Sequence, residues 1–455
     1  MMKIDREPDV AVGLMTGVDG VSFELKGQFV GPDGARFDAG SYRASAASNM
    51  IEVVNAGGER RALSPEVKLA PEHAGSSFIV RDVEIGIDFH WQRKQDQEFR
   101  GALQLKLSGG KLVVINPVPV EEYLISVISS EMSATSHPEL LKAHSIISRS
   151  WLLAQLKPWK KAHGQAHSTI KTNGGSKELI RWYDRENHAD FDVCADDHCQ
   201  RYQGITKATS REVFESIRAT FGQVLAYHDG LCDSRFSKSC GGMTESYAAA
   251  WEDITVPYLA VSYDGQAFPV EYQLPLSDET NAVAWIRNSP PAFCQTDDRK
   301  ILSKILPDFD QETTDFYRWH LVIGQEELQE LLRHKLGIDF GAIQKLEPIE
   351  RGGSGRLIRL KIVGERETVV IGKELEIRRA LSPRHLYSSA FVVDAEEGLS
   401  GIPSQFKLIG AGWGHGVGLC QIGAALMAEL GDDHRRILAH YYRGAQLHAL
   451  YDDAG

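Results

Sequence analysis

The sequence has little cysteine, no excess of basic residues and no long apolar run. Six cysteines among 455 residues are too few for a disulfide scaffold. Fifty Lys and Arg against 62 Asp and Glu give a formal charge of −12, so the net field does not favour nucleic acid or an anionic membrane surface as a partner. No run reaches the roughly 18 apolar residues that span a bilayer, and the amino terminus, MMKIDREPDVAVGLMTG, lacks the apolar core of a signal peptide. We therefore expect a cytoplasmic chain or one whose leader has been removed.

The length and the average composition predict a folded protein of several domains. At roughly 100–200 residues per domain, the chain forms two to four domains. The hydrophobic (42%) and charged (25%) fractions argue against disorder, collagen and coiled coil. We expect an α+β fold with a β-rich N-terminal region (1–110), a mixed α/β core with a helical pair (111–268 and 401–455) and an inserted α+β module (269–400).

Turn and capping signals place the elements of this core. Residues 111–115 predict a strand that ends at the proline-containing segment 116–119, because proline cannot donate to a ladder. Helices are expected over 120–132 and from Ser136 to about residue 156, the second with the form of a capping box. Residues 157–205 are polar and predict loops. Further elements are expected: a helix stopped by Gly222, a hairpin at Asp229-Gly230, a helix over 325–335 ended by Gly337, a strand over 357–363 and two helices after Gly418.

Glu131 is the first residue suited to chemistry. It follows Val127 by four positions and Ile128 by three, so it shares the apolar face of its helix. Burial there would raise its pKa, which is how a glutamate becomes a general acid near neutral pH. A glutamate at a fraying helix end is the alternative interpretation. The carboxylate of Glu122 lies about 14 Å away along the helix axis, whereas the two carboxylates of paired-carboxylate glycosidases are roughly 5–9.5 Å apart. If Glu131 acts on a sugar, it would therefore act without a second carboxylate.

A cysteine and histidine cluster is the second candidate. His188, Cys194, His198 and Cys199 offer four soft or borderline ligands within twelve residues. Four protein ligands would complete a tetrahedral zinc ion, which would then be structural and would order a long polar stretch. Scattered loop cysteines are the alternative. The sequence contains neither HExxH nor a nucleophile elbow, which argues against a metalloprotease or an α/β-hydrolase.

Glycine at every second position from 410 to 418 is the third feature. In an extended strand this pattern leaves one face bare, while Ala411, Trp413, His415 and Val417 line the other face. Tryptophan can stack on a sugar and histidine can orient or donate, although a tightly packed glycine strand fits the pattern equally well. The spacing does not fit GxGxxG, so a dinucleotide site is not favoured.

The segment 236–245, FSKSCGGMTE, is a further candidate for substrate contact. Its hydroxyl residues Ser237, Ser239 and Thr244 surround a double glycine. They could form a polar substrate wall or a simple turn.

Four segments in a fixed order resemble one protein family. They are Phe99-Arg100-Gly101; residues 116–149, with NPVPVEEYL, SEM and AHSIISR; SKSCGGMTE at 237–245; and GWGHGVGLCQ at 412–421 with HYYRG at 440–444. The chain resembles the SpoIID/LytB family, the stage II sporulation protein D and amidase-enhancer group that acts on bacterial peptidoglycan. The resemblance covers about residues 80–260 and 350–450.

The resemblance implies a lytic transglycosylase that cleaves the β-1,4 bond between N-acetylmuramic acid and N-acetylglucosamine. The family's catalytic glutamate falls on Glu131, which would protonate the leaving oxygen and then accept the proton of the muramoyl C6 hydroxyl. The internal hydroxyl closes a 1,6-anhydro ring, so a single carboxylate suffices. Arg149 matches the arginine of the family's second helix and would orient Glu131 or contact the glycan, with a structural ion pair as the alternative.

The resemblance also bears on binding residues, metal and location. Some sporulation members bind zinc through cysteines and histidines after the helical pair, which implies a structural zinc ion in the cluster described above. Small or hydroxyl residues are expected where this chain has Cys240 and Cys420. Glycan strands of peptidoglycan are the expected partner and the cell envelope the expected location. The residues expected to contact substrate are Arg149, Ser237, Ser239, Thr244, Trp413, His415 and Gln421.

The sequence leaves two rival functions open. A non-catalytic wall-binding protein that stimulates a cell-wall amidase would bind glycan without cleaving it. A hydrolytic glycosidase or zinc hydrolase would produce reducing ends or need an open metal position.

Overall fold

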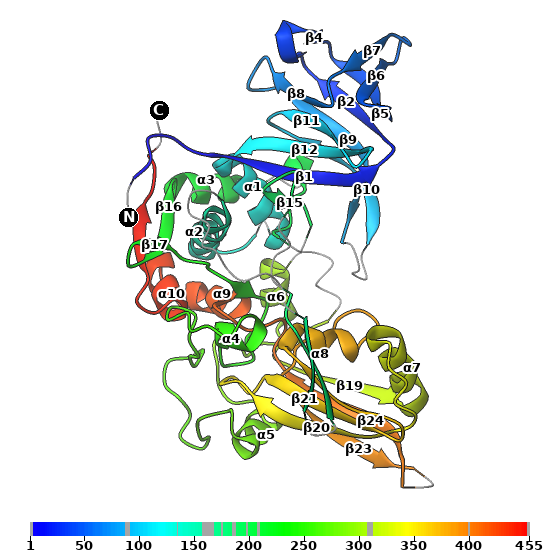
Figure 1. The fold of residues 1–455 in the computed structure, drawn as a ribbon. Coiled ribbons are helices and arrows are strands. Elements are labelled where there is room, and N and C mark those ends of the chain that lie inside the picture. Colours follow the sequence, from blue (N-terminus) through cyan, green and yellow to red (C-terminus); the bar gives the residue numbers. More distant parts are fainter. Residues whose placement is uncertain are drawn as a thin grey trace. The chain divides into compact units, whose positions relative to one another are not determined.

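The computed structural model divides the chain into two compact units (Figure 1). The first unit comprises Met1–Lys160, Asn187–Val224 and His448–Gly455, and the second comprises Lys161–Glu186 and Leu225–Leu447. The residues that the structure describes are 3–86, 92–133, 135–156, 168–173, 176–183, 188–196, 199–206, 210–306, 313–398 and 401–452.

Strands dominate the first unit, as the pattern over residues 1–110 predicts. They are β1 (Asp9–Val18), β2 (Gly20–Lys26), β3 (Phe29–Val30), β4 (Arg36–Phe37), β5 (Gly40–Ala47), β6 (Met50–Asn55), β7 (Arg60–Leu63), β8 (Glu66–Pro71), β9 (Ser77–Ile85), β10 (Arg93–Phe99), β11 (Leu103–Ser108), β12 (Lys111–Pro119) and β15 (Val193–Cys194). Within the described residues they form one sheet in the order β15-β1-β12-β11-β8-β3-β4 and another in the order β10-β9-β2-β5-β6-β7. β12 contacts β2 and β5 between the sheets. The buried ring of Phe29 meets that of Phe78 edge to face at 6.2 Å in the core.

β12 continues through its prolines, so the prediction that pairing ends before residue 116 is wrong. Asp9 pairs with Pro119 and Ala11 pairs with Pro117 in the antiparallel ladder with β1. Pro117 and Pro119 are two positions apart, so both missing N–H groups point to the same side. That side faces Ala102, whose N–H donates to the Pro117 carbonyl at 2.9 Å. The ladder with β1 on the other side is therefore complete, and β12 belongs to the N-terminal sheet.

The helical pair lies in the first unit. Its helices are α1 (Val120–Glu131) and α2 (Pro138–Gln155), and both pack with α3 (Arg211–Ala219). The structure confirms the two predicted helices but not the capping box. The N-cap of α2 is His137, whose Nδ1 accepts the Glu139 N–H at 3.2 Å.

The second unit joins sheets and helices from both sides of the inserted region. Its elements are β13 (Ser168–Asn173), β14 (Ser176–Arg181), β17 (Gly230–Leu231), β18 (Phe236–Ser237), α4 (Tyr247–Ala250), α5 (Glu279–Arg287), α6 (Arg299–Ile305), β19 (Arg318–Gly324), α7 (Gln325–Leu336), β20 (Ile343–Arg351), β21 (Leu357–Gly364), β22 (Thr368–Gly372), α8 (Glu374–Ala380), β23 (Phe391–Glu397), β24 (Pro403–Ala411), β25 (Leu419–Cys420), α9 (Gln421–Glu429) and α10 (His434–Tyr441). β16 (Gln223–Tyr227) and β26 (Gln446–Ala449) each contain a boundary between the units.

A large apolar core holds the inserted region together. The sheets β13-β14-β22-β21-β20 and β19-β24-β23 contribute buried side chains to it, together with α7 and α8. α7 ends at Gly337 in the left-handed conformation (φ 69°), as predicted. Residues 157–205 are not all loop, because β13 and β14 form a hairpin that pairs in parallel with β22. The structure confirms the predicted α+β fold.

No helix among the described residues has both the length and the apolar character needed to cross a bilayer.

Candidate functional site

Glu131 is the last residue of α1 and is half-buried. The helix ends there because Met132 turns to extended backbone, while its N–H still bonds to the Ile128 carbonyl at 3.0 Å. Oε1 of Glu131 accepts the backbone N–H of Arg201 at 3.1 Å. The carboxylate is therefore held by a main-chain group from a distant segment of the same unit.

The segment 200–203 runs along α1 and fixes this contact. The N–H of Gln203 donates to Oγ of Ser126 at 2.9 Å. The ring of Tyr202 stacks on that of Tyr123, with centroids 5.1 Å apart, and both rings are fully buried. Because this packing leaves little freedom to the segment, the position of the Arg201 N–H is well defined relative to α1.

Three of the four predicted metal ligands meet just before this segment. One ligand atom each from His188, Cys194 and Cys199 lies within 4.8 Å of the other two. Sγ of Cys199 is 3.5 Å from Nε2 of His188 and accepts the N–H of Cys194 at 3.4 Å. The fourth predicted ligand, His198, lies outside the described residues. This cluster has the ligand types and spacing to hold a metal ion.

Arg149 has a different partner from the one the resemblance implied. Its side chain is fully buried, and its guanidinium donates to both carboxylate oxygens of Glu121, at 2.8 and 2.5 Å, and to the Gln223 carbonyl at 2.9 Å. The two bonds to Glu121 form the structural ion pair that the sequence left open as the alternative. Arg149 does not contact Glu131 in this arrangement.

Glu121 gathers further groups around that ion pair. Its Oε1 accepts the hydroxyl of Tyr451 at 2.6 Å and the N–H of Gly222 at 3.2 Å. Its own N–H donates to the carboxyl of Glu7 at 2.6 Å. Burial, together with the negative charge of Glu121, raises the pKa of Glu7 to about 7, although the N–H of Glu121 opposes the shift. The network ties the helical pair to both ends of the chain.

The other predicted substrate residues lie in the second unit, where the family motifs at 237–245 and 412–421 pair with each other. Ser239 and Trp413 exchange two backbone hydrogen bonds, of 3.1 and 2.8 Å. β18 pairs in parallel with β25, which sets Ser237 beside Cys420. Segments separated by about 180 residues in the chain therefore form one structure.

The glycine motif is not an extended strand, so that prediction is wrong. β24 ends at Ala411, and Gly412, Gly414, Gly416 and Gly418 all have positive φ angles of 73–92°. These are left-handed conformations that only glycine adopts readily, so the motif forms successive turns.

The turns of the glycine motif surround Arg356. This guanidinium is fully buried and donates to the carbonyls of Gly414 at 3.2 Å and Cys240 at 3.1 Å. A Cβ on Gly416 would collide with it. The alternating glycines thus serve close packing around a buried cation and not a bare strand face.

Among the predicted substrate residues of this unit, Trp413 and His415 are partly exposed, whereas the others are buried. The buried residues are Ser237, Ser239, Thr244 and Gln421. Thr244 illustrates their role, because its hydroxyl donates to the Ala260 carbonyl at 3.1 Å and accepts the Ser262 N–H at 2.8 Å. The geometry makes Trp413 and His415 the accessible members of the set.

His415 is held in one orientation and kept neutral. Its Nδ1 accepts the N–H of Val417 at 3.0 Å, and its ring meets that of Trp251 edge to face at 4.9 Å. Burial, with the positive charges of Arg235 and Arg356, lowers the pKa of His415 well below its usual value. The imidazole is therefore uncharged at neutral pH. Trp413 is braced in turn by aromatic neighbours, with Tyr387 at 4.3 Å and Phe316 at 4.7 Å between ring centroids.

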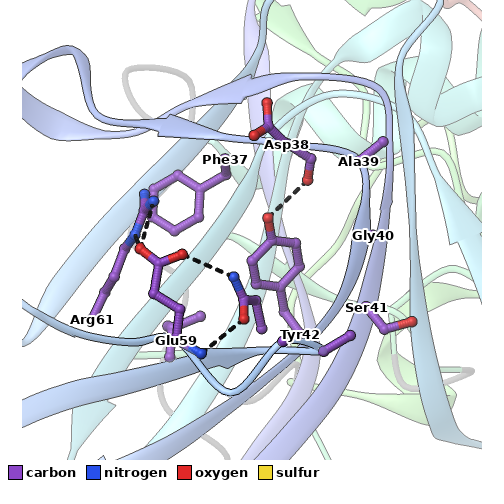
Figure 2. A pocket seen from close by; sticks show the side chains of 12 residues that line it. Phe37, Asp38, Ala39, Gly40, Ser41, Tyr42, Glu59 and Arg61 are labelled. Carbon is purple, nitrogen blue, oxygen red and sulfur yellow. Dashed lines mark hydrogen bonds and ion pairs between the residues drawn. The ribbon is translucent and has the colours of Figure 1, made fainter.

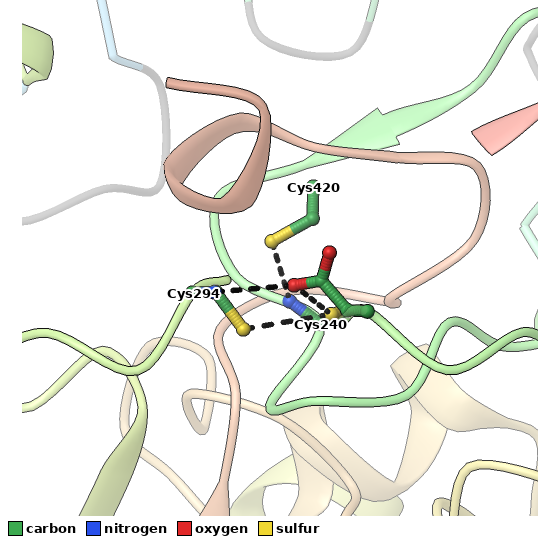
Figure 3. Close-up of side chains that lie close together, drawn as sticks. Cys240, Cys294 and Cys420 are labelled. Atoms are coloured by element: carbon green, nitrogen blue, oxygen red, sulfur yellow. Dashed lines mark hydrogen bonds between the residues drawn. The ribbon is translucent and has the colours of Figure 1, made fainter. Parts of the chain in front are cut away.

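Sequence reasoning missed a second cluster of ligand-type side chains in this unit (Figure 3). Cys240, Asp264, Cys294 and Cys420 are buried, and one ligand atom of each lies within 4.8 Å of the others. Burial raises the pKa of Cys420, but hydrogen bonds from Cys240 and Cys294 outweigh it and lower the value to about 6. No local spacing connects residues so far apart in the chain. The one available signal was that Cys240 and Cys420 depart from the residues expected in the family motifs.

The first unit also has a small surface pocket (Figure 2). Its lining comes from residues 37–42 and from residues between 53 and 61. The guanidinium of Arg61 is 5.1 Å from the ring of Phe37, and the hydroxyl of Tyr42 donates to the Asp38 carbonyl at 2.8 Å. None of the predicted site residues lines it.

Comparisons with known proteins agree with these motifs. A family model described as stage II sporulation protein matches residues 108–227, and one described as "Domain of unknown function (DUF8618)" matches residues 245–418. Stage II sporulation protein D of Bacillus amyloliquefaciens is 23% identical over 337 residues, which is 73% of this chain and 75% of that protein. Stage II sporulation protein D of Bacillus subtilis (strain 168) is 22% identical over 360 residues, 76% of this chain and 82% of that protein.

The amidase enhancer of Bacillus subtilis (strain 168) is 24% identical over 244 residues, which is 51% of this chain and 32% of that protein. The chain belongs to the SpoIID/LytB family. The SpoIID match includes Glu131, Arg149 and the His188 cluster, whereas the second family model covers Asp264, Cys294 and the whole glycine motif at 410–418. The SpoIID chain thus combines the helical pair with a second matched region.

Proposed function

We propose that this SpoIID/LytB protein is a peptidoglycan lytic transglycosylase in which Glu131 is the single acid and base. The observation that carries the proposal is the placement of Glu131 at the end of a buried helix, with one carboxylate oxygen bonded to the Arg201 N–H at 3.1 Å. A single anchored and half-buried carboxylate suits a reaction that needs one group to give and then take a proton. Relatives named for stage II sporulation and for amidase enhancement support a role at the cell wall.

The reaction uses the two forms of this carboxyl group in turn. Protonated Glu131 donates its proton to the glycosidic oxygen as the bond between that oxygen and muramoyl C1 breaks. The resulting carboxylate accepts the proton of the muramoyl C6 hydroxyl while O6 bonds to C1. The product is a 1,6-anhydro end, no water is consumed, and Glu131 returns to its protonated form.

The His188 cluster has a structural role in this proposal. His188, Cys194 and Cys199 fit a zinc ion by ligand type and by the mutual proximity of their ligand atoms, with His198 as the expected fourth ligand. A zinc ion with four protein ligands stabilises the fold and does not bind substrate. Here it would order the chain immediately before the segment that bonds Glu131.

In this proposal the glycan strand binds to two partly exposed side chains of the second unit, Trp413 and His415. Trp413 offers a braced indole face for a sugar ring, and His415, two residues further along, is held with its Nδ1 on the Val417 N–H. The partner is the glycan strand of peptidoglycan, and the place of action is the cell envelope.

Product analysis by mass spectrometry tests the proposal. Purified glycan strands, with and without stem peptides, are incubated with the wild-type protein, with Glu131→Gln and with Glu122→Gln. Glu122 is a matched control because it lies on the same helix and pairs with Arg100 at the surface, at 3.1 Å. We expect anhydro-muramoyl ends from the wild type, a loss of about 10²–10⁴-fold for Glu131→Gln and near wild-type activity for Glu122→Gln.

Reducing ends in place of anhydro ends would identify a hydrolase and reject the proposed reaction. Unchanged cleavage by Glu131→Gln would reject the assignment of Glu131. The amidase-enhancer relative favours one alternative, a wall-binding protein that stimulates an amidase. That function predicts glycan binding without anhydro products, and equal stimulation of an amidase by wild type and Glu131→Gln.

A further inference from the structure

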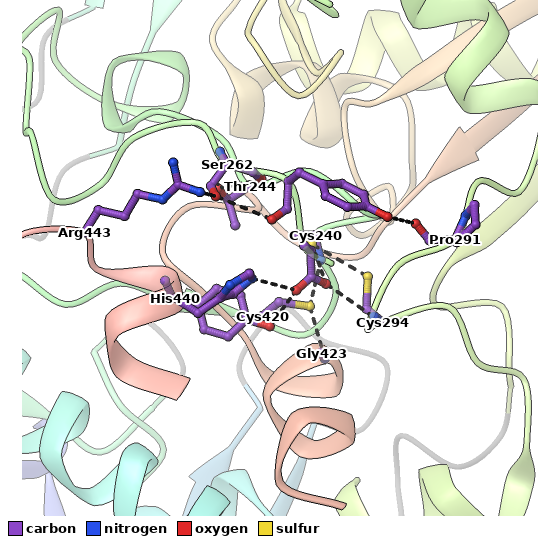
Figure 4. A network of polar contacts seen from close by, with 12 residues as sticks. Cys240, Thr244, Ser262, Pro291, Cys294, Cys420, Gly423, His440 and Arg443 are labelled. Carbon is purple, nitrogen blue, oxygen red and sulfur yellow. Dashed lines mark hydrogen bonds and ion pairs between the residues drawn. The ribbon is translucent and has the colours of Figure 1, made fainter. Parts of the chain in front are cut away.

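The buried cysteines and aspartate of the second unit have the composition of a metal site. We propose that a divalent metal ion of the zinc type binds there in a closed site, separate from the His188 cluster. Its four ligands are Cys240, Asp264, Cys294 and Cys420. Figures 3 and 4 show the three cysteine side chains close together.

The distances fit tetrahedral coordination. In a zinc site with Zn–S bonds of about 2.3 Å, neighbouring ligand atoms lie about 3.8 Å apart. Sγ of Cys240 is 3.6 Å from Sγ of Cys294 and 3.2 Å from Oδ2 of Asp264. All four ligand atoms lie within 4.8 Å of one another, so an ion at their centre requires only small side-chain movements.

One carboxylate oxygen of Asp264 faces the cysteines, and the other contacts Tyr441 and His440. Oδ2 faces Cys240 and accepts the N–H of Cys294 at 3.3 Å. Oδ1 accepts the hydroxyl of Tyr441 at 2.7 Å and lies 3.7 Å from Nε2 of His440. Outer partners of this kind orient a carboxylate ligand in metal sites. Asp264 has no exposed surface, and a buried acidic group surrounded by thiols is stabilised by a cation.

Cys420 has the environment of a thiolate ligand. It is the N-cap of α9, and its Sγ accepts the N–H groups of Gly423 at 3.4 Å and Cys240 at 3.2 Å. Backbone N–H groups at a helix N-terminus stabilise a thiolate. Gly423 is required at this point, because a Cβ there would collide with the Asp264 carboxylate and the Tyr441 hydroxyl. The first turn of α9 is thus fitted closely around the cluster.

The position of the cluster gives the metal a structural task. Cys240 lies in the segment 236–245, and Cys420 follows the last glycine of the glycine motif by two residues. Asp264 and Cys294 belong to the region matched by the second family model. Four protein ligands leave no open position for substrate. The ion would join the glycine motif, and with it Trp413 and His415, to the inserted region.

Metal counting by mass spectrometry tests this site separately from the His188 cluster. The full chain is produced with Cys199→Ser, which removes one ligand of the His188 cluster, and is washed with a weak chelator. We expect one zinc ion per chain, and less than about a tenth of that when Cys294→Ser is added. Cys232→Ser in the same background is the matched control, since Cys232 is also buried but lies outside both clusters, and it should retain the ion.

A second variant and a spectroscopic measurement distinguish loss of metal binding from misfolding of the chain. Asp264→Asn keeps the shape of the side chain and weakens its metal binding. We expect it to lose zinc while circular dichroism stays unchanged. In the Cys199→Ser chain loaded with cobalt(II), thiolate charge-transfer and tetrahedral d–d bands should appear, and Cys294→Ser should abolish them.

Three results would overturn the proposal. The first is that the Cys199→Ser chain contains no zinc although its cysteine thiols are reduced. The second is a zinc content that neither Cys294→Ser nor Asp264→Asn changes. The third is a disulfide between Cys240 and Cys294, detected in denatured wild-type protein as two cysteines that are alkylated only after reduction. None of these results depends on glycan cleavage, so failure here leaves the proposed function intact.

Discussion

The backbone N–H of Arg201 donates a 3.1 Å hydrogen bond to Oε1 of Glu131. Arg201 follows Cys199 by two residues, and Cys199 belongs to the cluster with His188 and Cys194. The group that orients the proposed catalytic carboxylate is therefore close in the chain to a predicted metal ligand.

Loss of the zinc ion proposed for the His188 cluster should reduce catalysis through this connection. We expect Cys199→Ser to lower kcat for glycan cleavage by about 10–100-fold, the usual range when the support of a site is removed, with a smaller change in KM. Steady-state assays on glycan strands measure both constants. Cys232→Ser is the control. A zinc-free Cys199→Ser chain with wild-type kcat would contradict the connection.

The buried pair of Arg149 and Glu121 should act on stability. Removing one partner leaves the other charge buried without compensation, so Arg149→Met should lower the free energy of unfolding by about 3–5 kcal/mol. The double variant Arg149→Met/Glu121→Gln should recover part of that loss. Urea denaturation followed by circular dichroism measures both effects. A stable Arg149→Met chain that binds glycan weakly would instead favour direct contact with the substrate.

Glu7 should make the protein more stable in mild acid. Its pKa is about 7 in the folded chain and 4.5 in the unfolded chain, so the folded state binds the proton more tightly. The stabilisation is fully present below pH 4.5 and is lost as the pH rises through 7. We expect Glu7→Gln, which retains an acceptor for the Glu121 N–H, to flatten this part of the stability profile. An identical profile for the two proteins would show that Glu7 titrates normally.

Two glycines with positive φ angles should respond differently to alanine. Gly418 and Gly431 have φ angles of 73° and 97°. A Cβ on Gly418 would collide with the Arg235 carbonyl, whereas a Cβ on Gly431 has open space around it. Gly431→Ala should therefore cost only the left-handed conformation, about 1–2 kcal/mol, and Gly418→Ala should cost clearly more. Thermal melts of the two variants compare them directly, and equal melting temperatures would argue against close packing of the glycine motif.

Local signals in the sequence were sufficient to predict several helices and where they begin or end. The apolar stripe and first-turn acids predicted α1, the proline and cap predicted α2 to within two residues, and Gly337 ended α7 as expected. Each of these depends on contacts within a few residues, which a sequence pattern records. The family motifs likewise pointed to Glu131, and the spacing of cysteines and histidines pointed to three residues whose ligand atoms lie within 4.8 Å of one another.

Long-range pairing decided the rest. The partner of Arg149 is Glu121, 28 residues away, and nothing in the spacing distinguishes it from other nearby acids. The alternating glycines looked like a strand because period two is the strand pattern, but the buried guanidinium of Arg356 imposes turns.

The sequence by itself determined the α+β composition, the helical pair and the family motifs, because these depend on local periodicity and on residue identity. Only the tertiary structure brought Cys240, Asp264, Cys294 and Cys420 together. Ligands that come from four separate segments have no characteristic spacing in the chain, and their proximity exists only once the motifs on either side of the inserted region have packed against each other.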